Sequence, residues 1–180
     1  MIERTIEVTN YCPYADTCLY CSTNATSDMD KAKFLTFDEI TNFLVEGIER
    51  INISGGEPLF HPEIGKIIWA CMKSCKEVRV YTNMLHHIQY NTDFVKDIKI
   101  DANVCMVAGK HAYLPKPTIK VKTHLLKLIH QGKGKSLPEQ YVEVSRNFCD
   151  MTHCDDCGHI LLQADGKIVT APCKKEYDNR

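Results

Sequence analysis

The sequence has no long hydrophobic run, little net charge and no apolar stretch at its start. Its longest apolar run, 67–72, is far shorter than the roughly 20 residues of a membrane-spanning helix. A net charge of −1 over 180 residues gives no overall attraction to nucleic acid or to a membrane surface. The opening MIERTIEV lacks the hydrophobic segment of a secretory signal. We therefore expect a cytoplasmic protein that acts on neither membranes nor nucleic acid.

Cysteine, in contrast, is abundant, with 10 residues. Since a reducing compartment disfavours disulfides, such a set indicates metal binding or redox chemistry. Two clusters lie at opposite ends, with the spacings C-x5-C-x2-C and C-x4-C-x2-C-x15-C: Cys12, Cys18 and Cys21, then Cys149, Cys154, Cys157 and Cys173. We expect two separate metal sites. The remaining three lie in apolar surroundings and are predicted to be buried small hydrophobes: Cys71, Cys75 and Cys105.

Strand patterns alternate with helix patterns between the two clusters. The expected strands are Thr5–Thr9, Arg50–Ser54, Glu77–Thr82, Ile98–Val107 and Gln140–Ser145. The expected helices are 36–50, 62–76, 93–97 and 123–131, the first opened by a capping box. This alternation predicts an α/β fold with a parallel sheet. Five such units would form a partial (βα) barrel, because a complete one needs roughly 250 residues.

The C-terminal segment has a different pattern. Two short strands, Ile160–Gln163 and Lys167–Thr170, flank Asp165-Gly166, which is a turn signal for a β-hairpin. We therefore expect two parts, a core over residues 1–146 and a small cysteine-rich β-hairpin extension over 147–180.

The N-terminal cysteines are compatible with two kinds of site. Three thiolates could be ligands of zinc or of an iron–sulfur cluster. A structural zinc site needs a fourth ligand, and the nearest cysteine or histidine after Cys21 is His61. A four-iron cluster with three thiolates leaves one iron open, which is a catalytic arrangement, so we favour the cluster.

A second motif follows the second expected strand, in the order Ser54-Gly55-Gly56-Glu57-Pro58. A glycine pair lets a ligand approach the backbone closely, and a neighbouring carboxylate can hold an amine. Together with Cys18-Leu19-Tyr20-Cys21, this motif resembles the radical S-adenosylmethionine (radical SAM) superfamily. The third strand, 78–83, also resembles that family, and the similarity covers roughly residues 4–146. One departure is that five residues separate Cys12 from Cys18, where the commonest family spacing is three.

The resemblance implies a specific chemistry. Cys12, Cys18 and Cys21 would bind a 4Fe-4S cluster whose fourth iron chelates S-adenosylmethionine. Reductive cleavage would yield a 5′-deoxyadenosyl radical that abstracts a substrate hydrogen, with flavodoxin or ferredoxin as electron donor. The implied contacts of S-adenosylmethionine are Glu57 with Gly55 and Gly56 for the methionine amine, Tyr20 for the adenine, and Thr82, Asn83 and Ser145 for the ribose or carboxylate. For Thr82 and Asn83, a turn that ends the strand is an equal alternative.

The C-terminal cluster resembles both a zinc ribbon and the auxiliary-cluster extensions called twitch and SPASM. In those extensions cysteines flank a hairpin, as Asp165 to Cys173 (DGKIVTAPC) would here. We favour a second 4Fe-4S cluster at Cys149, Cys154, Cys157 and Cys173, with zinc or unmetallated thiols as alternatives. His153 and His159 could replace a ligand, although exposed loop histidines are the simpler interpretation.

These features together predict a radical SAM enzyme that acts on a peptide, a protein or a small anionic, nucleotide-like substrate. The preference for an anion comes from residues 108–138, which hold seven lysines and no acidic residue, although such a run can also be a solvated face. The alternative is a non-catalytic iron–sulfur or zinc protein that transfers electrons or serves as a scaffold.

Overall fold

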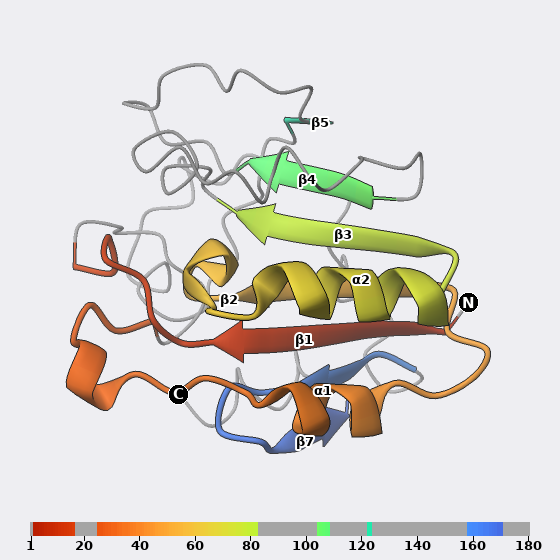
Figure 1. The fold of residues 1–180 in the computed structure, drawn as a ribbon, viewed down its shortest axis with the longest axis horizontal. Coiled ribbons are helices and arrows are strands. Elements are labelled where there is room, and N and C mark those ends of the chain that lie inside the picture. Colours follow the sequence, from red (N-terminus) through yellow and green to blue (C-terminus); the bar gives the residue numbers. More distant parts are fainter. Residues whose placement is uncertain (1, 17–24, 83–103, 109–121, 124–157, 171–180) are drawn as a thin grey trace.

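The fold is seen in a computed structural model that describes residues 2–16, 25–82, 104–108, 122–123 and 158–170. Its described strands form one sheet in the order β5-β4-β3-β2-β1-β6-β7 (Figure 1). The strands are β1 (Glu3–Thr9), β2 (Arg50–Gly55), β3 (Glu77–Thr82), β4 (Val104–Ala108), β5 (Lys122–Thr123), β6 (Ile160–Leu162) and β7 (Ile168–Thr170). The described helices are α1 (Phe37–Phe43) and α2 (Ile64–Ser74), with short 3-10 turns η1 (Met29–Lys31) and η2 (Pro58–Phe60).

Most of the sheet is parallel. Strands β1 to β5 pair in parallel with their neighbours, β6 runs parallel to β1 on its other side, and β7 is antiparallel to β6. The predicted mixed α/β fold with a mostly parallel sheet is therefore confirmed. Closure of this sheet into a partial barrel stays a prediction. The strand expected at Gln140–Ser145 and the helix expected over 93–97 lie outside the described residues.

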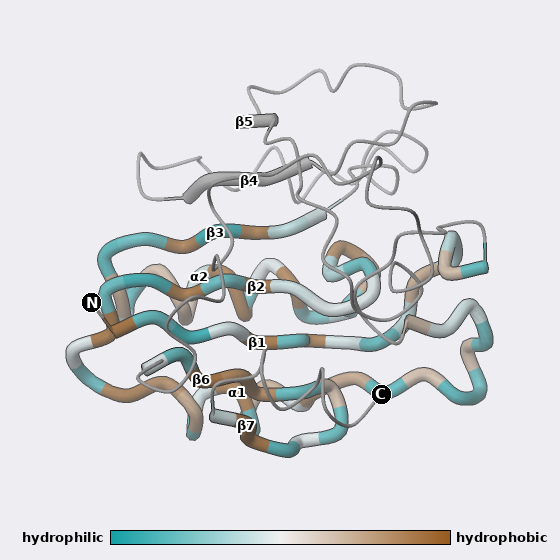
Figure 2. Tube along the Cα trace, turned by 180° about the vertical axis from the view of Figure 1, so that it is seen from behind, coloured by the Kyte–Doolittle hydropathy of each residue, from teal (hydrophilic) through white to brown (hydrophobic). Residues whose placement is uncertain are grey.

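Strands β1, β2 and β3 each present an apolar face and a polar face. Side chains alternate across a strand, and the hydropathy along β1, β2 and β3 alternates accordingly (Figure 2). Both α1 and α2 lie on the same face of the sheet (Figure 1), where the fully buried strand residues include Ile6, Ile51, Ile53, Val78 and Val80. Burial of each such side chain contributes about 1.5–3 kcal/mol, so this face is the core of the described fold.

The first helix is shorter than expected. Its capping box is present, since Thr36 Oγ1 accepts from the Glu39 amide and the Glu39 carboxylate accepts from the Thr36 amide. The expectation that it continues to Arg50 is wrong, because α1 ends at Phe43. The chain then turns through Gly47, at φ +83°, and the amide of Arg50 donates to the Ile2 carbonyl as β2 begins. A glycine suits this backbone conformation because it has no Cβ.

The other boundaries differ by smaller amounts. Helix α2 begins at Ile64, two residues after Pro62, and β3 has the predicted bounds. The prediction that a helix begins at Thr123 is wrong, because this residue pairs with Ala108 in the sheet. The strand expected over Ile98–Val107 is observed as β4, and residues 98–103 lie outside the described part.

Strands β6 and β7 connect the C-terminal part of the chain to the sheet. They pair antiparallel around a turn in which Gly166 has φ +83°. Strand β6 also pairs with β1, with Ile160 opposite Arg4. In the ranges that the structure describes, no helix is long and apolar enough to cross a membrane.

Candidate functional site

Three strands bring predicted site residues to one edge of the sheet. Cys12 follows the end of β1, Glu57 follows the end of β2, and Thr82 is the last residue of β3. The carboxyl ends of parallel strands meet at the same edge, which is where open α/β sheets bind ligands. We therefore describe this edge as the candidate site.

The two glycines after β2 pack against the segment that leads to Cys12. The Gly56 amide donates to the Thr9 carbonyl at 2.7 Å, and the Glu57 amide donates to the Tyr11 carbonyl at 2.8 Å. A Cβ on Gly55 would overlap the Thr9 carbonyl oxygen, and one on Gly56 would lie 2.5 Å from the Tyr11 carbonyl carbon. The close approach that the glycine pair predicts is thus made, in the described residues, by the backbone of the chain itself.

The two ends of the cysteine-containing loop are joined next to this contact. The Cys12 amide donates to the Thr26 carbonyl at 2.8 Å, and the Thr26 amide donates to the Asn10 carbonyl at 2.9 Å. Farther from the edge, the Thr9 hydroxyl donates to the Lys33 carbonyl at 2.8 Å. Cys12 is 7% exposed. These bonds fix where the loop leaves and rejoins the sheet, and so fix the backbone position of Cys12.

Glu57 is a buried carboxylate, 1% exposed. Its Oε1 accepts a hydrogen bond from the Leu59 amide at 3.1 Å and one from the Thr82 hydroxyl at 2.5 Å. Burial of a charge is unfavourable unless hydrogen bonds compensate for the lost water, and these two donors do so. The sequence places Thr82 and Glu57 at the ends of adjacent strands, but it does not predict the hydrogen bond between them.

His61 lies beneath the edge with both ring nitrogens in use. Its Nε2 is 2.8 Å from the Leu35 carbonyl oxygen, and its Nδ1 accepts from the Glu63 amide at 3.1 Å. These two partners require a neutral ring with the proton on Nε2. Burial lowers the pKa of His61, which favours the same neutral form. His61 is therefore not placed to be the fourth ligand of an N-terminal zinc site.

An aromatic cluster surrounds this histidine and supports the start of the loop. The Tyr11 ring packs edge-on against Phe60, with centroids 5.5 Å apart, and lies tilted against Phe34, with centroids 6.4 Å apart. Phe34 in turn contacts the His61 ring at 5.8 Å. Such pairs contribute about 0.5–1.5 kcal/mol each beyond their buried area, so they stabilise the residue that precedes Cys12.

Cys71 on α2 behaves as a buried hydrophobe, whereas Cys75, the residue that caps this helix, is only partly buried. Cys71 is fully buried, which confirms the prediction for it. Cys75 is half-buried, and its Sγ lies 3.2 Å from the carbonyl oxygens of both Cys71 and Glu77, to one of which its single S–H donates. Burial raises the pKa of both thiols, which favours their protonated forms. Across the described ranges, no group of three or more His, Cys, Asp or Glu side chains is placed to hold a metal ion.

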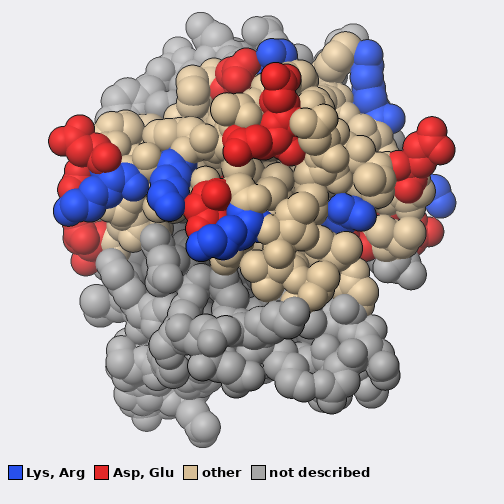
Figure 3. Space-filling view, turned by 90° about the horizontal axis from the view of Figure 1, so that it is seen from below, with Lys and Arg blue, Asp and Glu red and all other residues tan. Residues whose placement is uncertain are grey.

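The other predicted site residues lie outside the described residues: Cys18, Tyr20, Cys21, Asn83, Ser145, Cys149, Cys154, Cys157 and Cys173. His159 lies within the described part, where it is half-buried rather than exposed, and its Nε2 is 2.6 Å from Thr5 Oγ1. On the face seen in Figure 3, basic and acidic side chains of the described residues are interspersed, so neither sign of charge dominates that face.

The fold and the site define a parallel α/β protein whose cysteine loop and glycine–glutamate segment meet at the carboxyl edge of the sheet. The family model of the radical SAM superfamily matches residues 6–120, which is more than half of the chain. The chain therefore belongs to the radical SAM superfamily, whose members typically bind a 4Fe-4S cluster and S-adenosylmethionine. No curated protein matches the chain. The matched range includes Cys12, Gly55, Gly56, Glu57 and Thr82, which the structure gathers at one edge.

Proposed function

We propose that this protein is an enzyme that reductively cleaves S-adenosylmethionine and uses the resulting radical to remove a hydrogen atom from a substrate. The observation that carries the proposal is the 2.8 Å hydrogen bond from the Glu57 amide to the Tyr11 carbonyl. This bond joins the glycine–glutamate segment to the residue immediately before Cys12. A carboxylate for the cofactor amine and a ligand for the iron cluster are thereby held beside each other.

Cys12, Cys18 and Cys21 would hold the 4Fe-4S cluster. Cys12 fits this role because it is almost fully buried at the edge of the sheet, on a backbone fixed by Thr26. His61, the fourth ligand that the zinc alternative required, is occupied on both nitrogens. Held by these cysteines and reduced, a cluster would supply the one electron needed to break the bond between sulfur and C5′ of S-adenosylmethionine, which would give methionine and the 5′-deoxyadenosyl radical.

Glu57 would accept hydrogen bonds from the amine of S-adenosylmethionine. The hydrogen bonds from Thr82 and Leu59 hold the carboxylate in place, and its burial strengthens the attraction to a cationic amine. Tyr20, Gly55, Gly56, Asn83 and Ser145 are proposed as further contacts of the cofactor, as their family positions imply.

We assign Cys149, Cys154, Cys157 and Cys173 to a second site, which we propose is a 4Fe-4S cluster, with zinc as the alternative. Support comes from the pairing of Ile160 with Thr170 at the open end of β6 and β7. Cys157 precedes this pair by three residues and Cys173 follows it by three. The contact of His159 Nε2 with Thr5 favours these cysteines over His159 as ligands.

The proposed electron donor is flavodoxin or ferredoxin, and the proposed setting is the cytoplasm. The substrate class expected from the sequence is a peptide, a protein or a small anionic molecule. A non-catalytic electron carrier would have no use for a buried carboxylate beside its cluster, so the position of Glu57 favours the enzyme.

The experiment is to compare Glu57→Gln with Glu63→Gln in protein purified without oxygen. Glu63 is a matched control because it lies at the start of α2 and its carboxylate pairs with the exposed Lys66. We expect Glu57→Gln to keep its iron and visible absorbance but to bind S-adenosylmethionine at least tenfold more weakly, while Glu63→Gln behaves as the wild type. Unchanged binding in Glu57→Gln would contradict the proposed role.

A further inference from the structure

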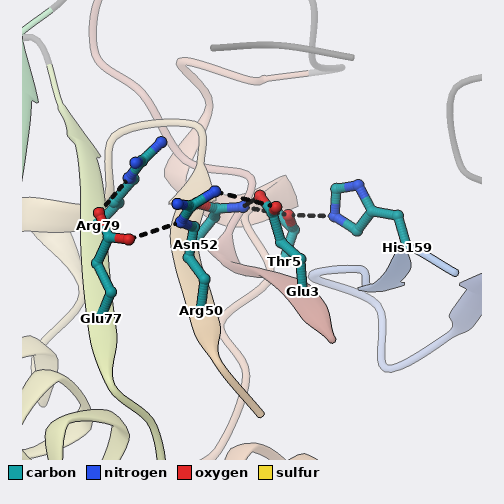
Figure 4. A network of polar contacts seen from close by, with 7 residues as sticks. All are labelled: Glu3, Thr5, Arg50, Asn52, Glu77, Arg79 and His159. Carbon is teal, nitrogen blue, oxygen red and sulfur yellow. Dashed lines mark hydrogen bonds and ion pairs between the residues drawn. The ribbon is translucent and has the colours of Figure 1, made fainter. Parts of the chain in front are cut away.

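A network of polar side chains crosses the face of the sheet opposite α1 and α2 (Figure 4). Glu3, Arg50 and Glu77 lie level on β1, β2 and β3. Arg50 donates to Glu77 at 2.8 Å and to Glu3 at 3.3 Å, and Arg79 donates to the other oxygen of Glu77 at 2.7 Å. Both guanidinium groups are therefore committed to carboxylates of the chain.

Asn52 lies at the centre of this network and is 5% exposed. Its Nδ2 donates to Glu3 Oε1 at 2.6 Å and lies 3.4 Å from Thr5 Oγ1. Its Oδ1 is buried and has no hydrogen-bond partner among the described residues. An unpaired buried acceptor costs about 1–3 kcal/mol. Rotating the amide would not relieve this cost, because Oδ1 would then face the Glu3 carboxylate, which cannot donate.

The charges of the network balance, so the unpaired acceptor decides which kind of ligand this face favours. Within the network, the carboxylates of Glu3 and Glu77 stand against the guanidinium groups of Arg50 and Arg79. His159 adds no positive charge, because burial lowers its pKa and keeps the ring neutral. A carboxylate or a fully ionised phosphate has no proton to donate, so it could not pair with the Asn52 acceptor.

Asn52 also lies on β2 at a distance from the candidate site that one substrate molecule can span. It precedes Gly55 by three residues on β2, which corresponds to about 10 Å along the strand. A group held at Asn52 would thus extend from the polar face of the sheet toward the edge that carries Cys12 and Glu57.

We propose that the polar face around Asn52 binds the substrate through an N–H donor, a primary amine or an amide, which bonds to Asn52 Oδ1. This inference rests on the proposed function and specifies its substrate class. It differs from the expectation of an anionic substrate, which came from the lysines of residues 108–138, a segment largely outside the described residues.

The test uses the full chain, purified without oxygen, and saturation-transfer NMR with propylammonium, N-methylacetamide and propionate as probes. We expect propylammonium or N-methylacetamide to give a signal that falls at least fivefold in Asn52→Leu, and propionate to give none. The control is Asn42→Leu, the same change at an exposed position of α1, which should keep the wild-type signal.

A second variant covers the case in which Asn52→Leu does not fold. Asn52→Asp keeps an acceptor oxygen but places a second carboxylate beside that of Glu3. Propylammonium should therefore raise the melting temperature of this variant more than that of the wild type. If Oδ1 holds only a structural water, neither nitrogen probe will bind better than propionate, and the inference is wrong. Cleavage of S-adenosylmethionine by the wild type, measured in the same preparation, tests the proposed function separately.

Discussion

The contact between Gly56 and Tyr11 gives the most specific prediction about the construction of the site. In Gly56→Ala, the new methyl group would lie 2.5 Å from the Tyr11 carbonyl carbon and 2.8 Å from that of Asn10. These are backbone atoms, so no side chain can rotate to make room. The segments must separate, which weakens the hydrogen bonds from the amides of Gly56 and Glu57.

The expected loss of stability combines these two effects. Two hydrogen bonds contribute about 1 kcal/mol each, and overpacking costs about 1–3 kcal/mol, so we expect Gly56→Ala to lose about 3–5 kcal/mol. Against a typical total of about 5–15 kcal/mol, this is a large fraction. The same movement displaces the backbone before Cys12, so iron content should fall as well.

The assay is urea denaturation without oxygen, with iron determined on the same samples. Gly47→Ala is the matched control, because Gly47 has φ +83° but nothing within 4 Å of its Cβ position. Its loss should be about 1–2 kcal/mol, from backbone strain alone. If Gly56→Ala loses no more stability than Gly47→Ala, the packing of the glycine segment against the cysteine loop is not as described.

Three further predictions concern side chains near the site. Thr82→Val should lose about 1.5–3 kcal/mol in the same denaturation assay, because Glu57 loses a buried donor; no loss would contradict that hydrogen bond. Folding favours the neutral form of His61, so the contribution of His61 to the free energy of unfolding is complete above its ordinary pKa of 6.5 and is lost as pH falls through the lowered pKa. Between pH 7 and 5, His61→Gln should therefore lose less stability than the wild type does. Cys71 in the folded protein should resist alkylation by iodoacetamide at pH 8, because burial raises its pKa, and fast labelling would place the thiol elsewhere.

The parts of the fold that the sequence predicts are those set by local patterns. Strand β3 has its predicted bounds because alternating Val78 and Val80 are followed by a polar strand end. The capping box of α1 was identifiable because its two partners, Thr36 and Glu39, lie three residues apart. The end of α1 was not identifiable, because the chain leaves the helix at Leu44, which is extended and has no glycine or proline beside it.

The candidate site follows the same rule. Cys12 and Glu57 were identifiable from short motifs that follow strands, and parallel strands bring such motifs to one edge. The sequence does not show what occupies the space beside Gly55 and Gly56, because a glycine pair indicates a close approach without showing whether a ligand or the backbone makes it. Nor could the sequence show that Asn52 lies beside Glu3 with one oxygen unpaired, because that depends on the register between β1 and β2.

The central claim is that this protein cleaves S-adenosylmethionine at the edge that carries Cys12 and Glu57. The most direct measurement is 5′-deoxyadenosine, determined by chromatography after the iron-loaded protein is reduced with dithionite in the presence of S-adenosylmethionine. We predict 5′-deoxyadenosine from the wild type and none from Cys12→Ala. A wild-type protein that carries its iron and remains folded, yet releases no 5′-deoxyadenosine, would contradict the claim.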